Sequence, residues 1–132
     1  MTEIPAGFQP LREVKGYIRL SGPFFRRQDE DGREVYGFLS DDRHGNPNGV
    51  LHGAAILTFV DTMLGHAVVS ATGRTCATIS LTSQFVAGVP TGSWISGRAE
   101  IRRLTKSLVF LDAEASCDDK LLLTATAIFR LF

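Results

Sequence analysis

The residues whose types and spacing could support chemistry lie between Asn46 and Asp61, in the stretch NPNGVLHGAAILTFVD. His52 and Gly53 fall where a long apolar helix is predicted to begin, so the first backbone N–H groups there have no partner within the helix. The helix dipole adds partial positive charge at this point, which favours developing negative charge on an oxygen atom. Because Gly53 has no side chain, a substrate carbonyl could approach its backbone closely. The start of this helix is therefore a candidate oxyanion site.

Asp61 is the only acidic residue of the predicted helix. At about 100° per residue it lies within about 20° of Ala54, on a face of small and polar residues. A carboxylate in this place could act as a nucleophile or as a general base for water. It lies about 12 Å from Gly53 along the helix axis, too far for both to act on one small atom. We therefore expect a dimer in which a second copy of the helix closes this gap.

Each of these residues also has a structural interpretation. A buried aspartate can be held by neighbouring threonines, His52 can orient its loop, and Gly53 can serve only a turn. The catalytic interpretation is favoured by the combination, because the acid is uncompensated on a helix that carries no other Asp, Glu, Lys or Arg.

The helix itself is predicted from Ala54 to about Ala71, with one broad apolar face and one small face. A membrane span would need about 20 predominantly apolar residues. A central aspartate costs about 3 kcal/mol on insertion, so a helix buried in protein is favoured. The apolar face should lie on a β-sheet, and the small face should meet a cavity or another chain. The apolar face comprises Ile56, Leu57, Phe59, Val60, Met63, Leu64, Ala67 and Val68.

The rest of the chain reads mainly as strands. Residues 1–15 are predicted to be an arm or a short helix around Gln9 to Val14, and a first strand is expected near Tyr17–Leu20 or slightly later. Asp29 to Gly32 predicts a turn before a strand at 34–39. Four alternating segments then follow at 75–86, 93–104, 108–118 and 121–132, with short connections that favour antiparallel neighbours. The sequence predicts an α+β fold in which a sheet of five to six strands wraps around the helix.

Composition narrows the functional classes further. With 132 residues the chain has the length of a single domain, 1–132. Its 14 basic residues balance its 14 acidic ones, which indicates neither nucleic acid nor a membrane surface as a partner. The isolated Cys76 and Cys117 suggest reduced thiols in a cytoplasmic protein. Three histidines without ligand spacing support no metal site.

The spacing Asn46-x-x-Gly49-x-x-His52-Gly53, followed by Asp61, resembles the signature of hotdog-fold acyl-CoA thioesterases. The most similar type is that of the phenylacetic-acid-degradation and 4-hydroxybenzoyl-CoA thioesterase superfamily. The order of predicted elements also matches over residues 16–132. The resemblance implies a hotdog fold, hydrolysis of an acyl-CoA substrate, a homodimer or dimer of dimers, and no cofactor besides the coenzyme A of the substrate.

By this resemblance Asp61 is the catalytic carboxylate, as nucleophile or general base. The N–H of Gly53 polarises the thioester carbonyl. Asn46 helps to hold the attacking water or the carboxylate, and His52 supports the thioester end. Thr78 stands where similar proteins place a Ser or Thr that reaches the site from the facing subunit.

The resemblance also implies a place for coenzyme A and contains one departure. Arg103, Lys106 and Ser107 lie at a turn between strands that similar proteins use to contact the CoA phosphates, although a solvated surface is the ordinary role of such residues. Ala54 stands where a second glycine is usual, so its methyl group is expected to narrow the acyl pocket.

Three other functions share these features. A hotdog hydratase or dehydratase is disfavoured because Asp61 occupies the thioesterase helix position. A non-catalytic acyl-CoA-binding protein would bind CoA esters without releasing thiol. A purely structural domain would do neither, so an assay of thiol release separates these possibilities.

Overall fold

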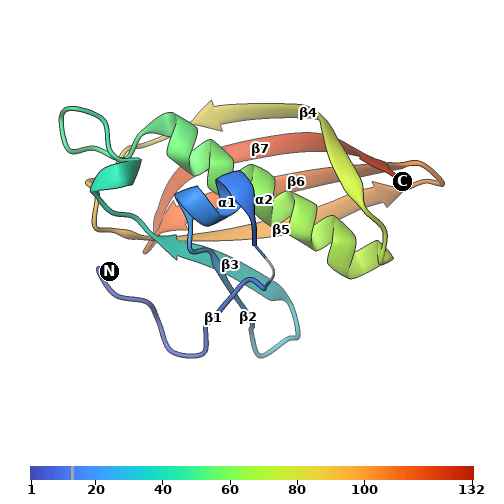
Figure 1. The fold of residues 1–132 in the computed structure, drawn as a ribbon, viewed down its shortest axis with the longest axis horizontal. Coiled ribbons are helices and arrows are strands. Elements are labelled where there is room, and N and C mark those ends of the chain that lie inside the picture. Colours follow the sequence, from blue (N-terminus) through green and yellow to red (C-terminus); the bar gives the residue numbers. More distant parts are fainter. Residues whose placement is uncertain (13) are drawn as a thin grey trace.

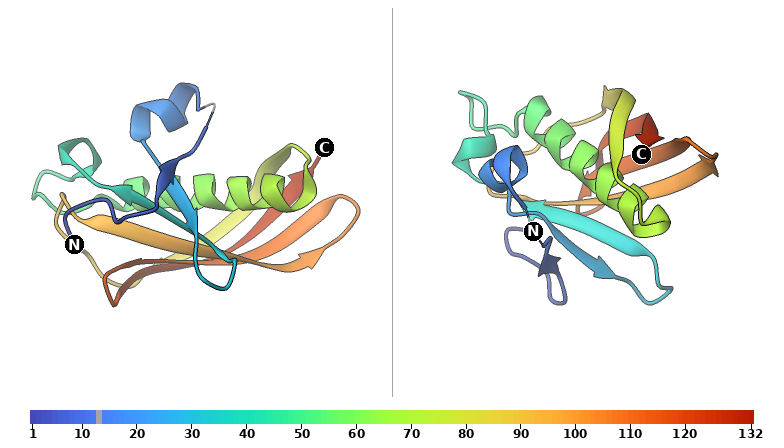
Figure 2. Two further views of the ribbon diagram at one scale, coloured as in Figure 1. Left: turned by 90° about the horizontal axis from the view of Figure 1, so that it is seen from below. Right: turned by 45° about the vertical axis from the view of Figure 1, so that its right-hand side comes forward.

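The computed structural model describes residues 1–12 and 14–132. It consists of an antiparallel sheet that wraps around a single long helix, α2 (Gly53–Thr72) (Figure 1). A short helix, α1 (Gly16–Ser21), lies on the side of α2 away from the sheet (Figure 2). The sheet has the order β1-β2-β3-β5-β6-β7-β4. Its strands are β1 (Gln9–Pro10), β2 (Phe25–Gln28), β3 (Glu34–Leu39), β4 (Cys76–Phe85), β5 (Trp94–Leu104), β6 (Leu108–Cys117) and β7 (Lys120–Leu131).

This arrangement is the hotdog fold, so the predicted α+β class is confirmed. The sheet has seven strands rather than five or six. The additional strand is β1, in which Gln9 pairs with Arg26 and Pro10 with Phe25. A strand of two residues is too short to show the alternation by which a sequence pattern reveals a strand.

The predicted apolar face of α2 is the face that packs on the sheet. Its buried residues are Ile56, Phe59, Val60, Met63, Leu64 and Val68, while the flanking Leu57 and Ala67 are half-buried. Gly73 ends the helix in a left-handed conformation with φ of 68°, and its N–H donates to the carbonyl of Val69. By length and composition α2 could cross a membrane, but its apolar side forms the core of this domain.

A glycine in β5 lets the sheet approach the helix closely. A Cβ atom on Gly97 would lie 2.8 Å from Sδ of Met63 and 2.9 Å from Cε2 of Phe59. No larger residue fits there without displacement, which is the use of glycine where two elements meet closely. The predicted inward-facing residues of β6, Val109 and Leu111 among them, are buried against the same helix.

Strand β4 departs from the prediction. It was expected to lie beside the next strand along the chain, but it pairs only with β7 and forms an edge of the sheet. The alternation over 75–86 predicts that Ile79 and Phe85 lie on a covered face, but they are 56% and 57% exposed in this chain. A register shift between Thr78 and Ser80 interrupts the alternation, as a β-bulge does.

The N-terminal predictions are also corrected. Tyr17–Leu20 belongs to α1, and the strand expected there begins later, with β2 at Phe25. The segment packs against α2, where the Tyr17 hydroxyl lies 3.2 Å from the Thr58 hydroxyl, and strand propensity depends strongly on such context. The alternative of a short helix over 9–14 is wrong for Gln9 and Pro10, which form β1, and Glu13 lies outside the described residues.

Candidate active site

Asp61 and Thr78 form the central contact of the candidate site. Asp61 is half-buried in the middle of α2, and Thr78 lies on the edge strand β4. The Thr78 hydroxyl donates a hydrogen bond of 2.6 Å to Oδ1 of Asp61. This contact forms within one chain, whereas the resemblance implied that Thr78 acts from the facing subunit. A short bond of this kind holds the carboxylate in one orientation.

The carboxylate opens into a cavity of about 770 Å³, which we call the helix groove. The groove runs along the small face of α2, between the α1 segment and β4. Its walls include Tyr17 and Ile18 on one side and Cys76 and Leu81 on the other. The sequence predicts that this face meets a cavity or another chain, and in this chain it meets a cavity. Five small or polar residues of the face line the groove: Ala54, Thr58, Asp61, Thr62 and Gly65.

The start of α2 has the form expected of an oxyanion site. His52 caps the helix, and its Nδ1 accepts the N–H of Ala54 at 2.9 Å. The carbonyl of His52 accepts the N–H groups of Ala55 and Ile56. Among the described residues, the N–H of Gly53 makes no hydrogen bond. One backbone donor is thus left available at the positive end of the helix dipole.

Gly53 does not share the helix groove with Asp61. It lines a separate hollow of about 330 Å³ on the other side of the helix start. There the exposed ring of Phe85 packs against it, and a Cβ on Gly53 would lie 3.0 Å from Cε1 of that ring. Within one chain, the proposed oxyanion donor and the carboxylate therefore face different spaces.

Asn46 and His52 serve the loop and the helix start in this chain. Oδ1 of Asn46 accepts the N–H groups of Asn48 at 2.9 Å and Val50 at 3.1 Å, which closes the loop before α2. Such local bonds are the ordinary role of asparagine in turns. Neither Asn46 nor His52 lines the groove that holds Asp61.

Arg103, Lys106 and Ser107 lie at the β5–β6 hairpin, next to the C-terminal end of α2 (Figure 1). Their side chains are exposed. The hairpin is held by Arg74, whose Nη1 donates to the Lys106 carbonyl at 2.8 Å. Gly73, at the near end of α2, is about 18 Å from Asp61 along the axis, so the hairpin is not part of the groove.

A pair of residues that the sequence patterns did not indicate also reaches the groove. His66 lines it, and the hydroxyl of the buried Tyr36 lies 2.9 Å from Nδ1 of this ring. Nδ1 also lies 3.4 Å from the Ser70 hydroxyl, and with the imidazole proton on Nε2 it accepts the hydrogen bond from Tyr36. Burial lowers the pKa of His66 and raises that of Tyr36. The two residues are 30 positions apart, and no local motif links them.

Residues 48–124 match the family model described as the thioesterase superfamily. This segment is more than half of the chain and includes Gly53, Asp61 and Thr78. The chain belongs to the thioesterase superfamily. Its resemblance to hotdog thioesterases is thereby confirmed.

Individual relatives agree with this assignment. A Pseudomonas aeruginosa protein named "Putative esterase PA0474" is 29% identical over 133 residues, covering 99% of each chain. A Bacillus halodurans protein solved with CoA superposes with a TM-score of 0.82 at 21% identity, over 92% of this chain and 82% of that one. The Escherichia coli PaaI protein of the phenylacetic acid degradation operon gives 0.79 at 16% identity, over 89% and 86%. Together with the family, these relatives support thioester hydrolysis as the general activity.

Proposed function

We propose that this thioesterase hydrolyses an acyl-CoA to a free acid and coenzyme A in the cytoplasm, without a further cofactor. Asp61 acts as nucleophile or general base, and the N–H of Gly53 from a second copy of the chain stabilises the oxyanion. The observation that carries the proposal is the placement of these two groups. Asp61 faces an open groove with its orientation held by Thr78, and an available backbone donor lies on the same helix but in another hollow.

In the general-base form, Asp61 takes a proton from water, and the hydroxide oxygen bonds to the thioester carbon. The carbonyl oxygen becomes negative and accepts the N–H of Gly53, as oxyanion donors act in acyl transfer. The carbon–sulfur bond then breaks, and the thiolate of coenzyme A leaves. In the nucleophile form the carboxylate oxygen attacks first, and water hydrolyses the resulting anhydride.

The edge strand β4 supports a shared site. Beyond its pairing with β7, the other side of β4 has no strand partner among the described residues. Three large apolar side chains are exposed along it and just after it: Ile79, Phe85 and Val86. An unpaired strand edge with exposed apolar residues favours association with another chain. Because β4 borders both the helix groove and the Gly53 hollow, a second copy docked there would cover both.

Arg103, Lys106 and Ser107 are proposed to contact the CoA phosphates. The hairpin presents two exposed cations, with Arg74 fixing its backbone. Arginine and lysine side chains are the ordinary partners of phosphate groups. Asn46 and His52 are proposed to support the thioester group indirectly. They hold the loop before α2 and the first turn of the helix, where the N–H of Gly53 lies.

The first test measures thiol release with short, medium, long and aromatic acyl-CoAs. Asp61→Asn should lower turnover by about 10²- to 10⁴-fold, as loss of a general base does, while the melting temperature stays close to that of the wild type. Thiol release by the variant at the wild-type rate would remove Asp61 from the mechanism. Binding of acyl-CoA by the wild type without any thiol release would identify a binding protein instead.

The second test mixes two variants that are each inactive, Asp61→Asn and Gly53→Pro. Proline removes the proposed donor and is well tolerated at the first position of a helix. The preceding residue, His52, has φ of −70° and ψ of 137°, the extended conformation that precedes proline. Gly53→Ala is the matched control, because it places a Cβ against Phe85 but keeps the N–H.

In an equal mixture, half of the dimers are mixed, and one of their two sites carries neither defect. Activity should therefore recover to about a quarter of the wild-type value, by the symmetry of a two-fold dimer. If the chains are folded and have exchanged but no activity returns, Asp61 works within its own chain.

A further inference from the structure

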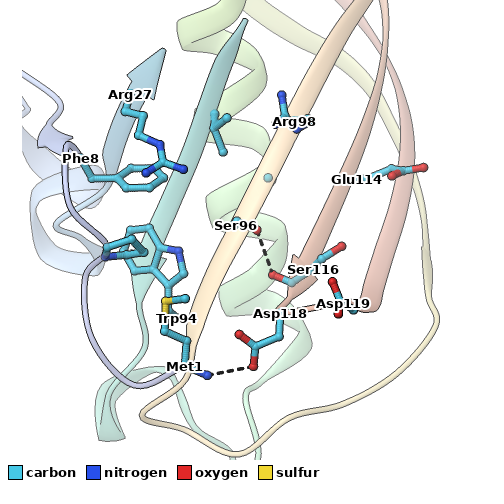
Figure 3. Close-up of a pocket in the computed structure, with 13 residues that line it drawn as sticks. Met1, Phe8, Arg27, Trp94, Ser96, Arg98, Glu114, Ser116, Asp118 and Asp119 are labelled. Carbon is cyan, nitrogen blue, oxygen red and sulfur yellow. Dashed lines mark hydrogen bonds and ion pairs between the residues drawn. The ribbon is translucent and has the colours of Figure 1, made fainter. Parts of the chain in front are cut away.

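The two faces of the sheet carry hollows of different character. On the face away from α2, a cavity of about 610 Å³ lies beside the N-terminal arm (Figure 3). Its lining carries charges of both signs, and the amine of Met1 forms an ion pair of 2.9 Å with Asp118. Balanced charges of this kind favour neither an anion nor a cation. The helix groove differs, because a ring nitrogen of His66 in its lining has no partner among the described residues.

This nitrogen is Nε2 of His66. The other ring nitrogen, Nδ1, lies 2.9 Å from the hydroxyl of Tyr36, which is 1% exposed and does not line the groove. The Nδ1 edge of the ring therefore faces β3. Nε2 is not buried, because the buried side-chain atoms without a partner in the described chain are Oδ1 of Asp29 and Oε2 of Glu34. We therefore take the Nε2 edge as the part of His66 that meets the groove.

The contact with Tyr36 makes Nε2 a hydrogen-bond donor. A neutral imidazole has one donor nitrogen and one acceptor nitrogen. Burial lowers the pKa of His66, so the ring is neutral near pH 7, and burial raises the pKa of Tyr36, which keeps its hydroxyl proton. When Nδ1 accepts this proton, the ring proton is on Nε2. An oxygen atom in the groove would then complete the hydrogen bonds of the ring.

The groove around this donor is mainly apolar. Apolar side chains line it on the α1 side, on α2 and on the sheet: Leu11, Ile18, Leu57, Val69, Leu81 and Phe129. Two cations of the lining, Arg12 and Lys15, are exposed. A purely apolar ligand would cover the donor without pairing it, and an unpaired covered donor is costly. The groove therefore suits a ligand with a hydrocarbon body and one oxygen acceptor.

Asp61 and His66 stand on opposite sides of this groove. Asp61 lies on the β4 side and His66 on the β3 side. The five positions between them correspond to about 7.5 Å along the helix axis and about 140° around it. Gly65 lies between the two on the helix surface, about 40° from Asp61. It has no side chain, so the crossing from one side to the other is open at this point.

The length of this crossing sets the length of the ligand. Over the surface of a helix about 10–12 Å in diameter, the path from Asp61 to His66 measures about 14–17 Å. A contact of about 3 Å at each end leaves about 8–11 Å between the carbonyl carbon and the acceptor oxygen. At about 1.2 Å per bond of an extended chain, this distance corresponds to about seven to nine bonds.

We propose that the groove takes a medium-length acyl chain that ends in a hydroxyl or carbonyl oxygen, and that this oxygen accepts a hydrogen bond from Nε2 of His66. The inference rests on the proposed function, because it places the thioester carbonyl at Asp61. The hydrocarbon part crosses α2 over Gly65 and packs against the apolar walls. His66 determines which acyl group is accepted and takes no part in the reaction itself.

Two substrates of equal size test the role of His66. 8-Hydroxyoctanoyl-CoA carries an oxygen where nonanoyl-CoA carries its last carbon, and the quantity measured is the ratio of their kcat/KM values. His66→Phe removes the donor and should lower this ratio about fivefold, the value of one ordinary hydrogen bond. His66→Gln keeps an N–H donor and should retain the ratio within about twofold. Ser70→Ala is the matched control, because it removes a hydroxyl 3.4 Å from Nδ1, at the other edge of the ring, and should leave the ratio unchanged.

Two further measurements test the length and the path. 4-Hydroxybutanoyl-CoA and pentanoyl-CoA are too short to reach His66, so their ratio should be the same in the wild type and in His66→Phe. Gly65→Ala narrows the crossing and should lower kcat/KM for 8-hydroxyoctanoyl-CoA more than for acetyl-CoA. Its melting temperature should not fall, because alanine favours a helix more than glycine does and the added Cβ would meet Phe129 at an ordinary 3.7 Å.

The outcomes separate this inference from the function on which it rests. Thiol release with an unchanged ratio in a folded His66→Phe would overturn the inference alone, and so would an equal fall of the ratio in Ser70→Ala or with the short pair. Equal effects of Gly65→Ala on the long and the short substrate would overturn it without any change to the ring. The absence of thiol release from every acyl-CoA would overturn the proposed function, and this inference with it.

Discussion

Replacement of Thr78 by valine isolates the contact that orients the Asp61 carboxylate, which we propose to be catalytic. Valine keeps the branched shape of the side chain but cannot donate the 2.6 Å hydrogen bond to Oδ1 of Asp61. Hydrogen bonds to charged groups contribute about 1.5–3 kcal/mol when buried. Because Thr78 is exposed and Asp61 only half-buried, we expect this hydrogen bond to contribute about 1 kcal/mol, below that range. Its loss corresponds to about a fivefold decrease of kcat/KM. Thr78→Ser keeps the hydroxyl and should remain within about twofold of the wild type.

The assay is steady-state thiol release, combined with a double-mutant cycle. In an Asp61→Asn background the valine substitution should have little further effect, because the charge it orients is already gone. Wild-type kcat/KM in Thr78→Val would refute the assigned role of this contact. Equal losses in both backgrounds would show that Thr78 acts on something other than Asp61.

Three other predictions concern separate parts of the molecule. If Arg103 and Lys106 bind CoA phosphates, their double replacement by alanine should raise KM with little change in kcat, and thioesters without the nucleotide should be unaffected. Gly97→Ala should lower the free energy of unfolding by about 1–3 kcal/mol in urea titrations, because its Cβ would overlap the core, whereas Gly88→Ala meets only ordinary contact at 3.5 Å and should be nearly neutral there. Burial lowers the pKa of His66 below its usual 6.5, so the unfolded chain binds more protons below that pH. The free energy of unfolding should therefore fall as pH decreases from about 6.5, and this dependence should be weaker in His66→Gln.

The helix and the inner strands could be predicted because their patterns are long and local. The segment that forms α2 has 20 residues and no glycine or proline between Gly53 and Gly65. Its apolar side chains recur at helical spacing, so the sequence predicts a helix there. Strands β5, β6 and β7 follow one another through short turns and pair in that order. The edge strand β4 could not be placed in the same way, because its partner β7 is distant in sequence and its bulge breaks the alternation. Helix α1 contacts α2 through residues such as Tyr17 and Thr58, which are 41 positions apart, so no local pattern contains this contact.

The candidate site was predictable to a similar degree. Gly53 and Asp61 are marked by their places on one helix, and their separation follows from the helix rise alone. The intrachain bond between Thr78 and Asp61 was not predictable, since it depends on where β4 lies at the edge of the sheet. The hydrogen bond between Tyr36 and His66, which joins β3 to α2, was not predictable either.

The hydrogen bonds around Asp61 favour an oxyanion donor from outside its own groove. The Thr78 hydroxyl already donates to Asp61, and the Thr58 hydroxyl donates to the Ala54 carbonyl at 2.9 Å. The Thr62 hydroxyl lines the same groove, about 100° around the helix from Asp61. Backbone N–H groups in the middle of the helix are used within it. Bending α2 cannot bring Gly53 nearer, because the helix has no proline that would kink it. We therefore propose that a carbonyl bound at Asp61 meets the N–H of Gly53 from a second chain, because this N–H makes no hydrogen bond among the described residues.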